Sequence, residues 1–220
     1  MRHLRLCILL ALVLFPWTSA PAQEVGADVA SEAIEQVAPE FLSARLHVTS
    51  VNRIGEETRT FRFRRMDRKV LMVADQTDKG RFTPETYYDY DRREYFLKLE
   101  SDDIVFSYRI TDRDMAQAQI YGWIPTPDQA DRFRLVVNEN LTFDGHPCTL
   151  ALVGYNTPGG GVLALHWVWE ARDLDGEVVR VVFPEAPGRQ VIVEYFDVHT
   201  DAFREDEVLP PAGLPVLSGF

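Results

Sequence analysis

The sequence predicts a mainly β fold with a smaller helical part. In this fold a strongly curved antiparallel sheet packs on an N-terminal amphipathic helix and a short mid-chain helix. Three observations lead to this prediction. Apolar residues recur at helical spacing near the N-terminus, the period then shifts to two, and short alternating segments separated by tight turns follow.

The segment that ends near residue 41 has the apolar spacing of a helix. Asp28 is a suitable N-cap, and Pro39 ends or kinks the helix. Because an apolar stripe must be buried, we expect this helix on the concave side of the sheet. The stripe comprises Ala30, Ala33, Ile34, Val37, Ala38 and Phe41.

About ten strands are expected after this helix. Leu46 and Val48 alternate with polar residues, and Phe61 and Phe63 do the same in the next segment. Turn residues separate the later segments, and the spacing of about 8–14 residues is typical of an antiparallel meander. The later strands are expected near residues 95–99, 104–110, 133–137, 148–153, 162–171, 178–183 and 190–198.

The segment 111–132 differs from its surroundings. Met115, Ala118 and Ile120 indicate a short helix. The following loop, Tyr121–Pro127, carries more large apolar groups than a solvated loop needs, so we expect it to cover or fill something. Tyr121, Trp123 and Ile124 are therefore candidate lid residues.

The first 22 residues have the parts of an export signal. Arg2 and Arg5 begin it, Leu6–Phe15 is a short apolar run, and Ala20 and Ala22 flank the expected cleavage site. We therefore divide the chain into a signal peptide (1–22), a single β domain (23–200) and an acidic, proline-containing C-terminal tail on the surface (201–220). The expected location is the periplasm or the exterior, with no later stretch that could span a membrane.

Composition excludes one class of partner. Removal of the two leader arginines changes the formal net charge from −11 to −13, which disfavours nucleic acid as a partner.

A local basic run, Arg59–Lys69, is interpreted as the polar face of a strand, with an anionic head-group contact as the alternative. Cys148 is the one cysteine after the leader, and we expect it to be a buried, inert thiol, with a reactive or intermolecular thiol as the alternative.

The sequence carries no familiar catalytic, phosphate-binding or metal-binding motif. The histidines after the leader are not at metal-ligand spacing, so we expect neither a metal nor a cofactor. His166 could act as a general base with Glu194 or Asp197 only if the fold brought them together. We therefore expect no catalytic residue and no enzyme activity.

The segment 162–169 is unusual because it is apolar on both faces. Trp167 and Trp169 lie on one face of the expected strand, and core packing is one explanation for them. The other is an open apolar cavity walled by these rings and capped by the Trp123 loop. Phe106 and Tyr108, which share a face of an earlier strand, complete the candidate ligand-binding set.

The order of these parts resembles the LolA-like lipoprotein carrier superfamily. The matching pieces are Tyr87–Asp91, Phe143–Cys148, Trp169–Leu174 and Tyr195–Val198, and the resemblance spans roughly residues 28–210. It is strongest to exported bacterial relatives of unknown function. The resemblance implies an unclosed β-barrel wrapped over helices around a hydrophobic cavity.

Two classes of function follow. We favour a monomeric exported protein that binds or carries an apolar small molecule, lipid, acyl chain or lipoprotein, or a sensor built on that fold. The alternatives are a hydrolase with an unrecognised site and an interaction subunit that binds another envelope protein.

Export is directly testable. N-terminal sequencing of protein from the native host should find a mature chain that begins near Gln23, because the short apolar run and small residues match what signal peptidase reads. A cytosolic chain that still begins at Met1 would contradict the signal.

Overall fold

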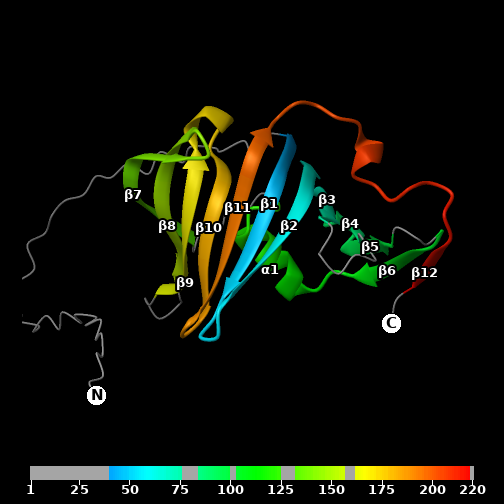
Figure 1. The fold of residues 1–220 in the computed structure, drawn as a ribbon, viewed down its shortest axis with the longest axis horizontal. Coiled ribbons are helices and arrows are strands. Elements are labelled where there is room, and N and C mark those ends of the chain that lie inside the picture. Colours follow the sequence, from blue (N-terminus) through cyan, green and yellow to red (C-terminus); the bar gives the residue numbers. More distant parts are fainter. Residues whose placement is uncertain (1–39, 76–83, 100–102, 125–131, 157–161, 219–220) are drawn as a thin grey trace, which may run out of the picture. The chain divides into compact units, whose positions relative to one another are not determined.

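Twelve strands form one mixed sheet in the described part of the chain (Figure 1). The computed structural model describes residues 40–75, 84–99, 103–124, 132–156 and 162–218. Most of the expected N-terminal helix, residues 28–39, lies outside these residues. Phe41, expected at its end, is instead the first residue of β1, opposite Met66 of β2.

The strand order is β12-β6-β5-β4-β3-β2-β1-β11-β10-β9-β8-β7. Neighbours pair antiparallel, except that β12 runs parallel to β6. The strands are β1 (Phe41–Val51), β2 (Glu56–Met66), β3 (Lys69–Ala74), β4 (Glu85–Asp89), β5 (Glu94–Lys98), β6 (Val105–Arg109), β7 (Arg132–Phe143), β8 (His146–Asn156), β9 (Val162–Ala171), β10 (Glu177–Ala186), β11 (Arg189–His199) and β12 (Val216–Ser218).

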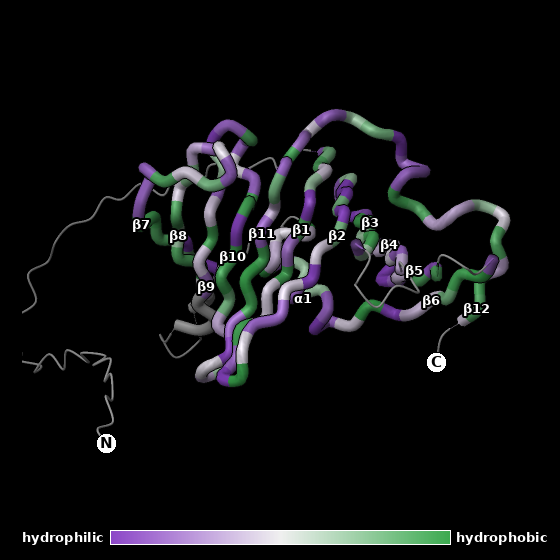
Figure 2. The backbone as a smooth tube through the Cα atoms, viewed as in Figure 1, coloured by the Kyte–Doolittle hydropathy of each residue, from purple (hydrophilic) through white to green (hydrophobic). Residues whose placement is uncertain are grey.

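The expectation of a mainly β fold with an unclosed sheet is confirmed, but strong curvature and uniform antiparallel pairing are wrong. The sheet stays open between its edge strands β7 and β12 and does not curl strongly. Alternation along a strand predicts which face is buried, but it does not predict the twist between strands. Figure 2 shows hydrophobic and hydrophilic residues alternating along the strands.

The expected mid-chain helix is present as α1 (Asp112–Ile120). Thr111 caps it: the Asp114 amide donates to the Thr111 hydroxyl, and the Asp114 carboxylate accepts from the Thr111 amide at 2.9 Å. At the other end, Gly122 has a positive φ of 75°, which favours glycine. A Cβ on Gly122 would lie 3.2 Å from Val178, so the turn also approaches the sheet too closely for a side chain.

The C-terminal segment contacts the sheet at several points. Lys69 pairs with Glu205 at 3.1 Å, and Arg64 pairs with Glu207. Val208 is buried, and the Phe203 ring packs on that of Phe41. Short 3₁₀ turns lie at Arg172–Leu174 and Glu205–Glu207. No helix in the described part of the chain is long and apolar enough to cross a bilayer.

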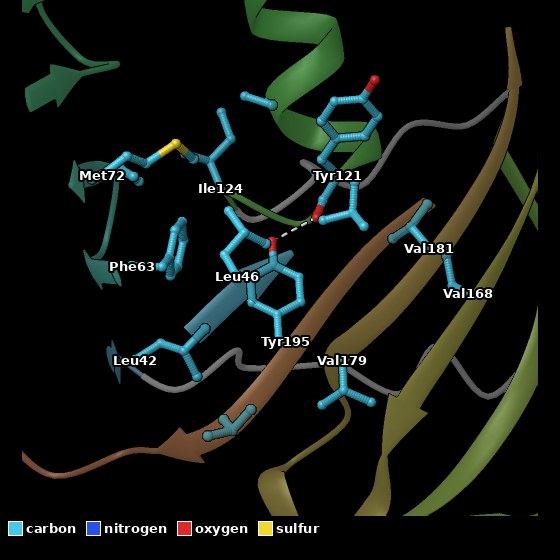
Figure 3. Close-up of a cluster of buried hydrophobic side chains, with 14 of the residues drawn as sticks. Leu42, Leu46, Phe63, Met72, Tyr121, Ile124, Val168, Val179, Val181 and Tyr195 are labelled. Atoms are coloured by element: carbon cyan, nitrogen blue, oxygen red, sulfur yellow. Dashed lines mark hydrogen bonds between the residues drawn. The ribbon is translucent and has the colours of Figure 1, made fainter. Parts of the chain in front are cut away.

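The core lies between one face of the sheet and the turn after α1 (Figure 3). Leu46, Phe63 and Val181 project from this face, and Tyr121 and Ile124 meet them from the turn. We call this the inner face. The Tyr195 hydroxyl donates to the Tyr121 carbonyl oxygen at 2.7 Å, which fixes the turn to β11.

A buried ion pair lies beside this contact. Arg65 on β2 is 2% exposed and donates to both carboxylate oxygens of Glu177 on β10, at 3.0 and 2.7 Å. Its guanidinium also donates to the Gly122 carbonyl at 3.2 Å. Burial alone would lower the pKa of Arg65, but the Glu177 carboxylate reverses this effect, so the pKa is raised and Arg65 stays charged.

Replacing Arg65 with Met should lower the free energy of unfolding by about 3–5 kcal/mol, because it leaves the Glu177 carboxylate buried without its cation. The matched control is Arg68→Met, which breaks the more exposed Arg68–Asp91 pair and should cost no more than about 1 kcal/mol. Denaturant melts measure both. Equal effects in the two variants would show that the buried pair is not a stability determinant.

Candidate functional site

A pocket of about 610 Å³ opens on the inner face, between the strands β4–β6 and α1. We call it the tyrosine pocket, because four tyrosines line it. Its polar residues, apart from the tyrosines, are Thr86, Arg109, Thr111, Asp114 and Gln117. Its apolar and aromatic lining includes Tyr88, Tyr90, Tyr95, Leu97, Tyr108 and Trp123.

The strand register brings the tyrosines together. Tyr88 lies opposite Tyr95, and Tyr95 lies opposite Tyr108, so their side chains project from the same face of three adjacent strands. Ring centroids are 5.6 Å apart for the first pair and 5.0 Å for the second. Tyr90 extends the row, since its ring stacks on Tyr88 at 5.6 Å.

Trp123 closes one side of this row. Its ring lies 6.2 Å from that of Tyr88 and 5.4 Å from that of Tyr121. Its backbone amide donates to the Ala118 carbonyl at 2.8 Å, which ends α1 and directs the chain toward the sheet. Trp123 is therefore held in position by the same turn that Arg65 and Tyr195 bind.

The hydroxyl groups of Tyr88, Tyr90 and Tyr95 stay protonated at neutral pH. Burial raises the pKa of Tyr88 to about 12, and neighbouring Tyr95 and Asp114 add to the effect. The pKa of Tyr90 is raised by burial and by Tyr88, and that of Tyr95 by burial and Tyr108. The Asp114 charge contributes to both of these shifts as well.

The structure brings together only some of the residues that the sequence singled out. Trp123 and Tyr108 line the tyrosine pocket, whereas Tyr121 and Ile124 are buried where the turn packs on the core. Phe106 is half-buried beside the pocket, opposite Leu97.

Trp167 and Trp169 do not lie on the inner face with Trp123. Val168 lies opposite Val181 on the inner face, so both tryptophans project from the other face of β9. Trp167 is 37% exposed there, between Leu152 and Val182 on the neighbouring strands. Trp169 packs under the Arg180 guanidinium, 4.7 Å from its ring centroid. The cavity that we expected between these rings and the Trp123 loop is therefore not formed.

Sequence reasoning missed Tyr88, Tyr90, Tyr95 and Leu97 as pocket residues. A signal was present, because Tyr88, Tyr95 and Tyr108 are all aromatic residues within short alternating segments. Their meeting depends on the register of β4 with β5 and of β5 with β6, which alternation alone does not give.

The other candidate chemistries find no support in the described residues. Glu194 pairs with Arg180 and Asp197 pairs with Arg45, and Glu194 lies on the outer face, whereas His166 lies opposite Val153 on the inner face. Cys148 is buried, and burial raises the pKa of its thiol, which disfavours the thiolate form that reacts. Within the described ranges, no three histidine, cysteine, aspartate or glutamate side chains gather as a metal site.

The basic run divides between the two faces. Arg65 turns into the core, whereas Arg62 and Arg64 line a smaller cleft of about 370 Å³ on the outer face with Arg45 and His199. Asp197 and Glu207 pair with Arg45 and Arg64. The positive charge of this cleft is therefore largely compensated within the chain.

Alkaline titration tests the environment of Tyr88. Tyr88 ionises near pH 10 in an unfolded chain but at about pH 12 in the folded protein, so folding favours its neutral form. Its contribution to stability, roughly 2–3 kcal/mol, is present below pH 10 and is lost as the pH rises toward 12. Urea melts at pH 8 and pH 11.5 should show a smaller loss for Tyr88→Phe than for the wild type. An identical loss would place Tyr88 in water.

Comparison with known proteins gives structural matches only. No family profile and no curated protein matches this chain. The lipoprotein LppX from Mycobacterium tuberculosis is 11% identical, with a TM-score of 0.42 over 73% of this chain and 88% of its own. A LolA superfamily protein from Nitrosomonas europaea is 8% identical, with a TM-score of 0.41 over 78% and 91%.

A third match is an outer membrane lipoprotein-sorting protein domain from Vibrio parahaemolyticus. It is 10% identical, with a TM-score of 0.35 over 76% of this chain and 88% of that domain. The structural matches thus include the LolA superfamily, which is the group that the sequence resembles. At these TM-scores they carry no argument about a ligand, and the function is therefore argued from the tyrosine pocket.

Proposed function

We propose that this chain is an exported, non-catalytic protein that binds an apolar ligand in the tyrosine pocket and serves as a carrier or sensor. The ligand is a lipid, an acyl chain or the lipid part of a lipoprotein. The observation that carries the proposal is the pocket itself, a hollow of about 610 Å³ lined by five aromatic rings. Small-molecule sites have this size and lining.

The position of the pocket supports the proposal. The inner face is covered by the turn after α1 over β1, β2, β10 and β11, but over β4–β6 the aromatic row borders a cavity. The rings are held by strand pairing and stacking, so the site is formed before a ligand arrives. A preformed site reduces the ordering cost of binding.

Burial of an acyl chain in the pocket would supply enough free energy for micromolar binding. Each buried methylene contributes about 0.8 kcal/mol, so fourteen carbons contribute about 11 kcal/mol when fully buried. An association cost of about 4 kcal/mol or more leaves a dissociation constant in the micromolar range. No catalytic group is needed for this function.

A fluorescent fatty-acid analogue tests the proposal. Wild-type protein should bind it saturably, and Trp123→Ala should weaken binding because it removes one wall of the pocket. Trp167→Ala, on the opposite face, is the matched control and should bind like the wild type. Denaturant melts should show that Trp123→Ala costs less than the 3–5 kcal/mol of a core truncation.

Two results would overturn the proposal. Absence of saturable binding by the wild type would contradict the proposed carrier function. Loss of binding in Trp167→Ala alone would move the site to the outer face. Mass spectrometry of organic extracts from the purified protein gives an independent answer, and a stably co-purifying envelope protein would instead favour the interaction-subunit alternative.

A further inference from the structure

The outer face of β1 and β2 carries three arginines side by side. Arg45 on β1 lies directly opposite Arg62 on β2, and Arg64 follows two residues later on the same face of β2. Like charges that lie directly opposite each other on neighbouring strands destabilise a sheet. The chain as a whole is acidic, with a formal net charge of −11, so composition does not explain this cluster of cations.

Acidic side chains neutralise two of the three cations. Arg45 pairs with Asp197 at 2.9 Å, and Arg64 pairs with Glu207. Arg62 is exposed, and its side chain forms no ion pair or hydrogen bond within the described residues. The positive charge that remains in the cluster therefore belongs to Arg62, which has a second arginine opposite it and a third beside it.

The cluster borders the outer-face cleft of about 370 Å³. On the far side of β2, Val73 lies opposite Arg62 and Leu71 lies opposite Arg64, both on β3. The cleft thus has cations on β1 and β2 and apolar side chains on the adjacent strand β3 (Figure 1). Because neighbouring strands are about 4.8 Å apart, a ligand with its charged end at Arg62 reaches Leu71 within a few carbon atoms.

Strand β11 is irregular where it borders this cleft. Asp197 has a positive φ of 52° and lies at a bulge in the pairing of β1 with β11. Its backbone amide donates to the Asp144 carboxylate at 2.8 Å, which holds the bulge in place. Bulges re-aim side chains and are common beside functional sites. Here the bulge places the acidic partner of Arg45 on the β11 side of the cleft, one strand away from Arg62.

We infer that this cleft is a second binding site, which takes a small amphiphile with an anionic head group. Arg62 binds the phosphate or carboxylate of the ligand, because a guanidinium fork matches the oxygens of either group. The apolar part of the ligand lies over Leu71 and Val73. The cleft and the tyrosine pocket are on opposite faces of the sheet, so this inference does not depend on the proposed function.

Three probes test the inference on the mature protein: octyl phosphate, inorganic phosphate and octyltrimethylammonium, each titrated below its micelle concentration. Backbone amide shifts in NMR spectra locate each probe, because Ser43 and Leu71 line the cleft whereas Tyr95 and Tyr108 line the tyrosine pocket. Octyl phosphate should shift the cleft amides saturably and bind there at least about 5-fold more tightly than inorganic phosphate, because only the former contacts β3. Octyltrimethylammonium should leave these amides unshifted, because Arg62 repels it.

Three variants separate the contributions of charge and apolar contact. Arg62→Gln keeps a long polar side chain but removes the charge, so it should weaken octyl phosphate about 5- to 10-fold. Arg59→Gln is the matched control, because Arg59 projects from the opposite face of the same strand; it should change the affinity less than about 2-fold. Leu71→Ala should weaken octyl phosphate and leave inorganic phosphate unchanged.

Four results would overturn the inference. Octyl phosphate that leaves the cleft amides unshifted would show that no site exists there. Equal effects of Arg62→Gln and Arg59→Gln would show attraction by overall charge. Inorganic phosphate that binds as tightly as octyl phosphate would show a site for free phosphate, and binding of octyltrimethylammonium in the cleft would show that the head group need not be an anion. None of these results bears on the tyrosine pocket, whose own amides report its ligand.

Discussion

The buried contact between Arg65 and Glu177 is the constraint on which the rest of the inner face depends. Two charges remain out of water at a tolerable cost when they bind each other and form further hydrogen bonds. The Arg65 guanidinium donates to both Glu177 oxygens and to the Gly122 carbonyl. The pair therefore links β2, β10 and the turn after α1, and this linkage fixes where the helical excursion covers the sheet.

The tyrosine pocket follows from this placement. The Arg65 and Tyr195 contacts hold the turn over the middle of the sheet, and α1 is short. The strands β4–β6 extend the sheet past the turn, so their inner face is bordered by α1 and Trp123 without being filled. An aromatic row is suited to such a border, because each ring is packed by its neighbours and remains ordered beside an open space.

Much of the strand pattern could be predicted from sequence, but the site could be predicted only in part. Alternation located most strands, and Asp144-Gly145, both with positive φ, correctly indicated the hairpin between β7 and β8. Periodicity also located α1. It did not reveal β3 and β4 as separate strands, nor the register that aligns Tyr88, Tyr95 and Tyr108. Trp167 and Trp123 were grouped because both are large and apolar, yet only the fold determines which face each occupies.

Under the proposed function, the ligand also stabilises the folded protein. Rings that border an open space make fewer packing contacts than rings in a filled core. A ligand that binds only the folded state lowers the free energy of that state by mass action, by about 2.7 kcal/mol at one hundred times its dissociation constant. A ligand that binds more tightly should then also raise the free energy of unfolding more at the same concentration. The Arg65–Glu177 pair lies outside this coupling, since the two side chains bind each other and neither of them lines the tyrosine pocket. The Arg65–Glu177 pair and a bound ligand would therefore stabilise the folded protein from different parts of the inner face. The pair holds the turn that borders the pocket, so a ligand can bind there only when the pair is formed.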